Sequence, residues 1–191
     1  MYSPLYVTTF IRDLLRELFK EYGGEQYSWD SDPKKSKITI GTVNDNHSNA
    51  RTQQFPRILV QRGPLQCNSQ FLSNNLRIRE SGGISRGGKD IHRQDIHGSM
   101  LIIVEARNEG SCELVGDLVR QFIAWSKLFI ETTFGFQAFA RQLSVGTCDM
   151  DREDTEKFKI NINIPYTVED GWEIEGNLTR LNHIFSSLSS D

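Results

Sequence analysis

A carboxylate stands at the end of the most apolar segment of the chain, two residues before a cation. Five apolar residues, Met100 to Val104, lead directly into Glu105, and Arg107 follows after Ala106. A Glu at the end of a buried strand, followed by a cation, is one half of a site that binds Mg²⁺ and cleaves phosphodiesters. The other half is an Asp on a neighbouring strand, so that two carboxylates hold the metal while a lysine positions the attacking water.

The rest of that constellation is incomplete here. Arg107 stands where a lysine is needed, and an arginine stays protonated and does not exchange protons. The two preceding strands that we expect, residues 38–43 and 56–62, contain no acid, and Asp45 comes just after the first of them. A metal-dependent nuclease of the PD-(D/E)xK type using Glu105 therefore stays an alternative. The favoured interpretation is that Glu105 and Arg107 share one side of a strand end, where they are solvated or meet a neighbouring subunit.

Other residue types that support catalysis do not form a recognisable set. His92 and His97 are five residues apart with Asp95 between them, a spacing that separates the two rings on a helix and puts them on opposite faces of a strand. No nucleophile elbow, Ser-His-Asp order or phosphate-binding loop is visible. We therefore expect no catalytic residue, no metal site and no cofactor.

A long segment, residues 63–96, lacks a strong pattern apart from one weak strand around residues 76–78. It reads as a long loop or hairpin insertion, and such segments in compact domains are usually functional or disordered. Its glycine-rich part carries four basic side chains that suit a contact with acidic protein or with a phosphate backbone, although a solvated loop without a partner is the alternative: Arg79, Arg86, Lys89 and Arg93. These four residues, with Glu105 and Arg107, are the candidate interface residues.

The elements that would position these residues follow from periodicity. An amphipathic helix opens the chain after Ser3-Pro4, with Val7, Ile11, Leu14, Leu15, Leu18 and Tyr22 on one face. A second helix, capped by Ser111 and running to about residue 133, has an apolar stripe of Leu114, Val115, Leu118, Val119, Phe122, Trp125 and Phe129.

The strands complete the expected fold. Residues 100–104 suit a central strand covered on both faces, and residues 157–166 alternate clearly between apolar and polar side chains. A further strand is expected at 141–148 and a short helix near 178–188. The order predicts an α+β protein, with a small, mostly antiparallel sheet packed by two main amphipathic helices in a single domain spanning residues 1–191.

Composition limits the class of protein. With 37% hydrophobic and 25% charged residues, the balance is that of a soluble protein, and no apolar run approaches the roughly 20 residues of a membrane span. Three scattered cysteines favour a reducing compartment. Residues 1–107 carry 15 Lys and Arg against 11 Asp and Glu, while residues 108–191 carry 7 against 14. Chance can produce such a split, and a protein stacked between different partners can use it for orientation.

The order and texture of several segments resemble the tail-terminator and neck (head-tail joining) proteins of tailed bacteriophages. The segments, which span most of residues 1–172, are the opening helix, "SWDSDPKKSKITIG", "FPRILVQRGP", "IHGSMLIIVEARNEGSCELVGDLVRQFIAW" and "FKININIPYTVEDGW". The long glycine-rich segment 63–96 departs from the family, which leaves open which neck protein the chain resembles.

The resemblance implies a structural virion subunit of the tail or neck, assembled in the host cytoplasm, without enzymatic activity, cofactor or membrane contact. Such a subunit forms a homo-oligomeric ring, expected to be a hexamer, that ends tail-tube polymerisation. The ring has the neck or connector protein on one face and the tail-tube protein on the other, and DNA passes through its lumen without specific binding. An adaptor domain of another assembly is the remaining alternative.

Overall fold

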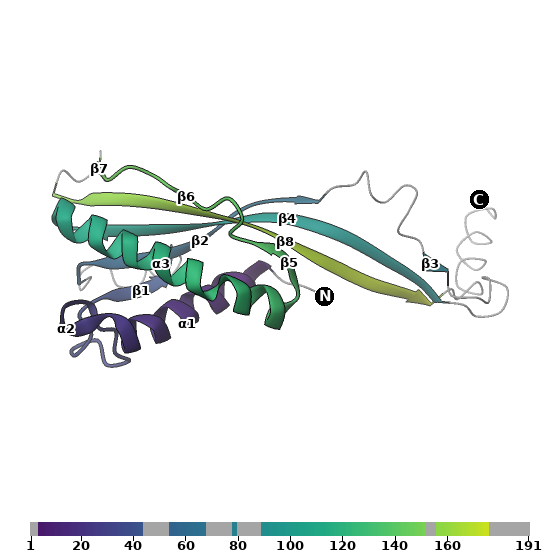
Figure 1. Cartoon of the computed structure of the whole chain (residues 1–191), viewed down its shortest axis with the longest axis horizontal. Helices are drawn as coiled ribbons and strands as arrows, with labels where there is room; N and C mark the ends of the chain where they lie inside the picture. The colour runs from purple at the N-terminus through teal and green to yellow at the C-terminus, as the bar shows by residue number, and fades with distance from the viewer. Residues whose placement is uncertain (1–3, 44–53, 68–77, 80–88, 152–155, 176–191) are drawn as a thin grey trace, which may run out of the picture. The chain divides into compact units, whose positions relative to one another are not determined.

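The computed structural model of the protein describes residues 4–43, 54–67, 78–79, 89–151 and 156–175 (Figure 1). The chain divides into two compact units. The larger unit comprises residues 2–66 and 97–168, and the smaller unit comprises residues 67–96 and 169–191 together with Met1. Every helix described below belongs to the larger unit. Within the described residues, no helix is long and apolar enough to cross a membrane.

Three helices and eight strands make up the described parts of the chain. The helices are α1 (Pro4–Tyr22), the four-residue α2 (Gly24–Tyr27) and α3 (Glu109–Phe134). The strands are β1 (Thr39–Thr42), β2 (Arg57–Cys67), β3 (Ile78–Arg79), β4 (Lys89–Ala106), β5 (Phe136–Phe139), β6 (Ser144–Val145), β7 (Asp149–Met150) and β8 (Phe158–Glu175).

The strands form a mixed sheet in the order β1-β2-β4-β8-β5. The β1–β2 pair is parallel, whereas β5, β6 and β7 pair antiparallel with β8. Figure 1 shows β4 running opposite to β2 and β8. β4 therefore lies in the middle of the sheet, as its apolar run predicts, and the expected α+β class with a mostly antiparallel sheet is confirmed.

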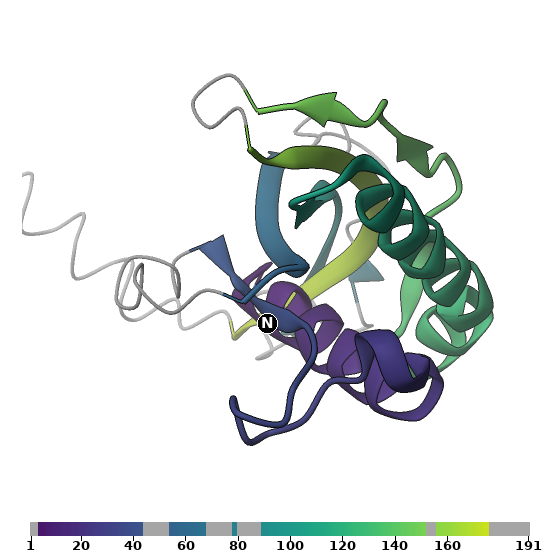
Figure 2. The same cartoon turned by 90° about the vertical axis from the view of Figure 1, so that its left-hand side faces the viewer.

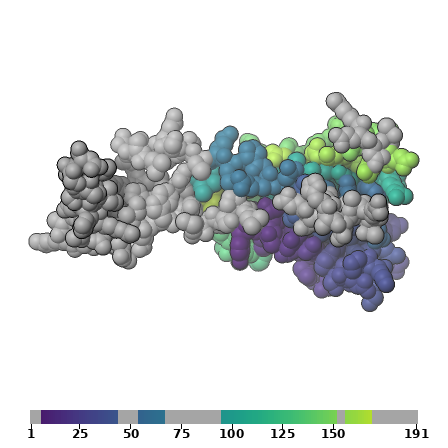
Figure 3. Space-filling model, turned by 180° about the vertical axis from the view of Figure 1, so that it is seen from behind, coloured from purple at the N-terminus to yellow at the C-terminus, as the bar shows by residue number. Residues whose placement is uncertain are grey.

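The core of the larger unit lies between the sheet and the two long helices, which pack on the same face (Figure 2). β4 contributes Met100, Ile102, Val104 and Ala106 to this core. β8 alternates as predicted, because Ile160, Ile162, Ile164 and Tyr166 are buried while Asn161 and Asn163 are exposed. The opposite view in Figure 3 shows atoms of β2, in blue, and of α1, in purple, at the surface.

The predicted stripe of α1 is wrong at its C-terminal end. Phe19 is fully buried, and its ring meets that of Phe122 edge-on at a centroid distance of 5.1 Å. Tyr22, which the helical spacing assigned to the buried face, is exposed because the buried positions step by four from Val7 through Ile11 and Leu15 to Phe19. On the same helix, the Arg16 guanidinium donates two hydrogen bonds to the backbone oxygen of Ile40. Ile40 lies in β1, which is an edge strand of the sheet.

The N-terminal end of α3 also differs from the prediction, in the residue that caps the helix. Asn108, not Ser111, is the N-cap, since its side-chain oxygen accepts a hydrogen bond from the backbone N–H of Ser111. Gly135 ends the helix in the left-handed conformation at φ 67°, which glycine adopts without steric cost. The Glu131 carboxylate then accepts a hydrogen bond from the Phe139 backbone N–H, so the end of β5 is tied to the helix that precedes it.

In the smaller unit, β3 pairs antiparallel with the first part of β4, at Ile78↔Ile91 and Arg79↔Asp90. Residues 63–67 and 89–96, which the sequence assigned to a loop or hairpin insertion, are therefore parts of β2 and β4. Residues 68–77 and 80–88 and the predicted final helix near 178–188 lie outside the described residues. Of the strand expected at 141–148, the structure has only the two-residue β6, and β5 and β7 lie on either side of that range.

Candidate interaction surfaces

Glu105 lies at the end of β4, on the face of the sheet opposite the helices. Its neighbours Val104 and Ala106 point into the core, so the alternation of the strand turns Glu105 the other way. There it forms an ion pair with the guanidinium of Arg57 on the adjacent strand β2. The Glu105 and Arg57 side chains are only 7% and 11% exposed. The expectation that Glu105 is solvated is therefore wrong, because its partner is an arginine of the same chain, 48 positions earlier in the sequence. The other expectation, a contact with a neighbouring subunit, stays a prediction.

Three cations surround the ring of Phe55 beside this pair. The guanidinium carbons of Arg57 and Arg107 lie 5.3 and 5.6 Å from the ring centroid, and the Lys157 ammonium lies 5.7 Å from it. We refer to Phe55, Arg57, Glu105, Arg107 and Lys157 as the cationic cluster. A cation over an aromatic face is worth about 0.5–1 kcal/mol at an exposed site. With three cations and one acid, this surface favours contact with an anion or an acidic partner.

Arg107 is the exposed member of this cluster, so its predicted exposure is confirmed. The Glu105 carboxylate is held by a guanidinium, which is a poor arrangement for a metal ligand because the cation would have to leave first. Among the described residues, no group of three or more His, Cys, Asp or Glu side chains is arranged to hold a metal ion.

The four basic residues of the predicted interface loop fall in the smaller unit or outside the described residues. Arg79 is on β3, while Lys89 and Arg93 are on the first part of β4. Arg86 lies outside the described residues. Their proposed role as interface residues therefore stays a prediction from the sequence.

A second surface lies on the outer side of α3, where large apolar side chains face water. Trp125, Leu128 and Phe129 are 64%, 71% and 53% exposed. The sequence placed Trp125, Phe129 and the exposed Leu114 on the buried stripe, and this prediction is wrong. The prediction is confirmed at Val115, Val119 and Phe122. The buried residues of the helix are Cys112, Val115, Gly116, Val119, Phe122, Ile123, Ser126 and Ile130.

Two small residues explain why α3 turns that side inward. A Cβ atom at Gly116 would lie 3.1 Å from the Cδ1 of Ile160, so the glycine permits a close approach of the helix to β8. Ser126 is buried because its hydroxyl donates to the Phe122 backbone oxygen within the helix. The large aromatic side chains on the other side are thereby left at the surface.

The exposed aromatic residues of α3 continue onto α1. Phe134, at the C-terminal end of α3, contacts Phe10 of α1 at a centroid distance of 4.1 Å and Phe129 at 5.9 Å. At the other end, the ring of Phe122 contacts that of Trp125, which is also on α3, and that of Tyr22 on α1. We refer to Tyr22, Trp125, Leu128, Phe129 and Phe134 as the aromatic strip. Phe136 and Phe139, which follow Phe134 along the chain, are in the core.

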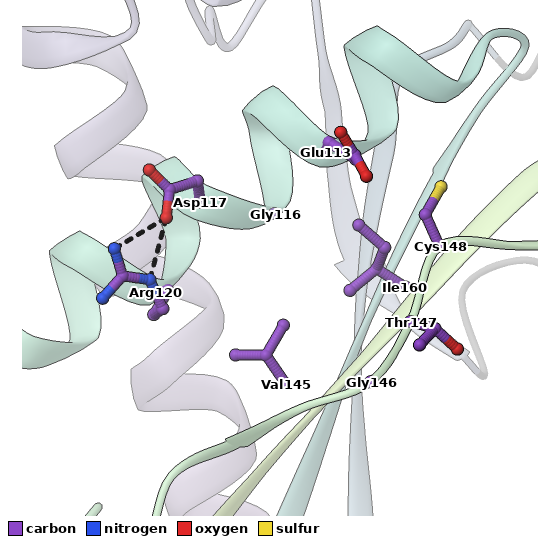
Figure 4. Close-up of a pocket in the computed structure, with 9 residues that line it drawn as sticks. All are labelled: Glu113, Gly116, Asp117, Arg120, Val145, Gly146, Thr147, Cys148 and Ile160. Carbon is purple, nitrogen blue, oxygen red and sulfur yellow. Dashed lines mark hydrogen bonds and ion pairs between the residues drawn. The ribbon is translucent and has the colours of Figure 1, made fainter.

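Figure 4 shows a pocket of about 400 Å³ between α3 and the segment that carries β6 and β7. Asp117 and Arg120 form an ion pair at its rim, with a shortest distance of 2.7 Å. The hydrogen bond from Arg120 is the main cause that lowers the pKa of Asp117. The inner wall is formed by Gly116, Ile160 and Cys148.

Another pocket, of about 310 Å³, has His97, Arg141, Tyr166 and Thr167 in its wall. The Nδ1 of His97 lies 3.0 Å from the Thr167 hydroxyl, so this histidine takes part in a pairing between β4 and β8. Gly98 is needed beside it because a Cβ atom there would lie 2.3 Å from the Tyr166 ring. His97 is thus placed beside Thr167.

Comparison with models of known protein families finds no match for this chain, and comparison with the sequences of curated proteins finds none either.

Proposed function

We propose that this protein is a structural subunit of a homo-oligomeric ring at the top of a bacteriophage tail or in its neck, where it ends tail-tube polymerisation and joins the tail to the head connector. The aromatic strip is the observation that carries the proposal. Soluble monomers rarely expose a contiguous group of large apolar side chains, and such a patch marks a surface that another protein covers.

The strip has the composition of an interface core. Trp, Tyr and Phe are enriched at the centres of protein–protein contacts, where a few of them supply most of the binding energy. Burying a large apolar side chain completely is worth about 1.5–3 kcal/mol. Trp125, Leu128 and Phe129 each expose more than half of their surface. A second copy of the chain that covered these three residues would therefore gain a few kcal/mol per contact.

The charges supply a second, independent argument for assembly. The cationic cluster presents Arg107 at the surface, while the part of the chain after residue 107 holds 14 acidic residues against 7 basic ones. Opposite charges on different parts of one chain orient neighbouring copies, or stacked proteins, relative to each other. In the proposed ring, the neck or connector protein contacts one face and the tail-tube protein the other, while DNA passes through the lumen without specific binding.

The test is the mass of the purified chain in solution, by native mass spectrometry and light scattering. We expect a closed ring whose mass is a multiple of 21.9 kDa, with six copies as the expected number. The double variant Trp125→Ser/Phe129→Ser should yield folded monomers. Met150→Ser on β7 is the matched control, because Met150 is also half exposed but is not part of the strip.

Three outcomes would contradict the proposal. A wild-type chain that stays monomeric at every concentration, and that no neck or tail protein retains, would remove the ring. Divalent-metal-dependent cleavage of DNA that Glu105→Ala abolishes would support the nuclease alternative instead. A ring that co-purifies only with non-viral proteins would favour an adaptor domain of another assembly.

A further inference from the structure

The outer edges of the sheet are the places where a strand of another chain could pair with it. β1 and β5 stand at the two ends of the strand order in the described part of the sheet. An edge strand presents unpaired backbone N–H and C=O groups, which are a template for pairing with a second chain. The state of these backbone groups therefore decides whether copies of this chain can join by continuing the sheet.

At β1, the side chain of Arg16 occupies the edge. The Thr39 backbone N–H donates to the Pro56 backbone oxygen at 3.1 Å, so Thr39 faces β2 and the next residue, Ile40, faces outward. The Nε and Nη2 of Arg16 lie 3.2 and 2.9 Å from the Ile40 backbone oxygen. The guanidinium also lies over the ring of Trp29, 5.3 Å from its centroid, which helps to hold it in place. The outward carbonyl of β1 therefore already has its hydrogen-bond donors.

A proline lies on the same edge beyond the end of β1. The pairing with β1 covers residues Arg57 to Val60 of β2, whereas β2 itself continues to Cys67. The backbone groups of successive residues alternate between the two sides of a strand, so those of Pro64 face the same side as those of Pro56, the side of β1. Proline has no backbone N–H, so a strand laid along this part of β2 would lose a hydrogen bond there. Pro64 is also exposed, as a proline in an edge position should be.

The edge at β5 is short and irregular, and an acid occupies it. The Ala140 backbone N–H donates to the Pro165 backbone oxygen of β8, so the preceding residue, Phe139, turns its N–H outward. The Glu131 carboxylate accepts a hydrogen bond from that N–H at 2.9 Å. The pairing of β5 with β8 also shifts register once, and β6 and β7, the other short strands that pair with β8, have two residues each. Short strands and bulges are further features that keep an edge from pairing.

We propose that Arg16, Pro64 and Glu131 protect the edges of the sheet, so that no strand of a second copy of this chain pairs with it. Each residue acts on a different backbone group: Arg16 binds an outward carbonyl, Pro64 lacks an outward N–H, and Glu131 binds an outward N–H. Copies of the chain then meet through side-chain surfaces, such as the aromatic strip, and not by continuing the sheet. The inference does not depend on the proposed ring, because a monomer needs the same protection.

The test is the triple variant Arg16→Leu/Pro64→Val/Glu131→Leu of the full chain. The two leucines remove the side-chain hydrogen bonds at β1 and β5, and the valine restores a backbone N–H in β2. We expect the mass by light scattering to reach at least about twice that of wild type and to rise with protein concentration, because each strand added at an edge brings another copy. The infrared spectrum should gain the amide I band of intermolecular β-sheet.

Matched variants separate the edges from a general gain of apolar surface. Lys20→Leu/Glu113→Leu also replaces a cation of α1 and an acid of α3 by leucine, at two exposed positions, and should keep the mass of wild type. Arg16→Lys and Glu131→Gln keep a donor and an acceptor at the two edges, so both should keep that mass as well. Pro64→Val alone removes no hydrogen bond, so it stays informative if the triple variant does not fold, and we expect from it a smaller rise in mass.

Three results would overturn the proposal. One is a folded triple variant, or a folded Pro64→Val chain in its place, that keeps the mass of wild type at every concentration. Another is an equal rise in mass of the Lys20→Leu/Glu113→Leu control. The third is growth that begins only where near-UV circular dichroism shows loss of the fold, since the unfolded chain would then be the species that associates. The mass of wild type reports on the ring separately, so failure of one proposal is distinguishable from failure of the other.

Discussion

Replacing Glu105 with glutamine removes the charge that faces Arg57 while it keeps the shape of the side chain. The guanidinium is then left with little access to water, since Arg57 is 11% exposed. Breaking a buried ion pair by removing one partner costs about 3–5 kcal/mol of the free energy of unfolding. We expect about 3 kcal/mol, at the lower end of that range, because Arg57 keeps its contact with the Phe55 ring.

The assay is urea unfolding followed by far-UV circular dichroism, arranged as a double-mutant cycle. Its variants are Glu105→Gln, Arg57→Met and the combination of both. The double variant should recover much of the lost stability, since neither charge then remains buried. The coupling energy between the two residues should exceed about 1 kcal/mol.

The matched control is the exposed pair of Asp117 and Arg120, whose side chains are 52% and 47% exposed. Asp117→Asn should cost less than about 1 kcal/mol, and added salt should reduce that cost further. The reasoning is refuted if Glu105→Gln costs as little as Asp117→Asn and shows the same salt dependence. Glu105 would then be solvated, as the sequence alone suggests.

Three further predictions concern other parts of the chain. Leu15→Asp should abolish the cooperative unfolding transition, measured by circular dichroism, because it buries an unpaired carboxylate at a fully buried position of α1, whereas Leu14→Asp at its half-buried neighbour should be milder. The pKa of Cys112 is raised to about 12, so its contribution to the free energy of unfolding is complete below pH 9 and is lost as pH rises towards 12. In urea unfolding, the free energy of unfolding of wild type should therefore fall by about 1 kcal/mol between pH 8 and pH 10, relative to that of Cys112→Ala. Deleting residues 82–88 should leave a folded subunit and weaken the ring, and a deletion variant with the ring stability of wild type would remove the predicted interface role of that segment.

The elements that the sequence predicts well are those with one clear periodicity. β8 alternates strictly, so its buried face could be assigned from the residue types alone. α3 is apolar around more than half of its circumference, so several stripes fit its sequence equally well. Gly116 and Ser126 determine which side of α3 faces the sheet. Gly116 permits a close approach of the helix to β8, and the buried Ser126 hydroxyl is hydrogen-bonded within the helix. Small residues are weak signals in a hydrophobicity pattern, and this explains why Trp125 and Phe129 were assigned to the core.

The candidate sites show a different limit. The exposure of Arg107 follows from its place at a strand end, and so does the turn of Glu105 away from Val104. The partner of Glu105 is Arg57, and the pairing of β2 with β4 brings the two residues together. Such contacts between distant positions depend on strand order and register, which a single sequence does not specify.

The buried pair of Arg57 and Glu105 has a further consequence for the register of β2 against β4. Both strands are apolar on both faces where they meet, at residues 58–60 and 100–104, so burial alone does not distinguish the native register from a shifted one. A shift by one or two residues would separate the two charges and leave each without its partner. We therefore predict that Arg57→Met/Glu105→Gln, although close to wild type in stability, shows additional amide resonances for β2 in NMR spectra, from chains with shifted pairing. A single set of resonances would show that the strands are aligned by packing against the helices and not by the ion pair.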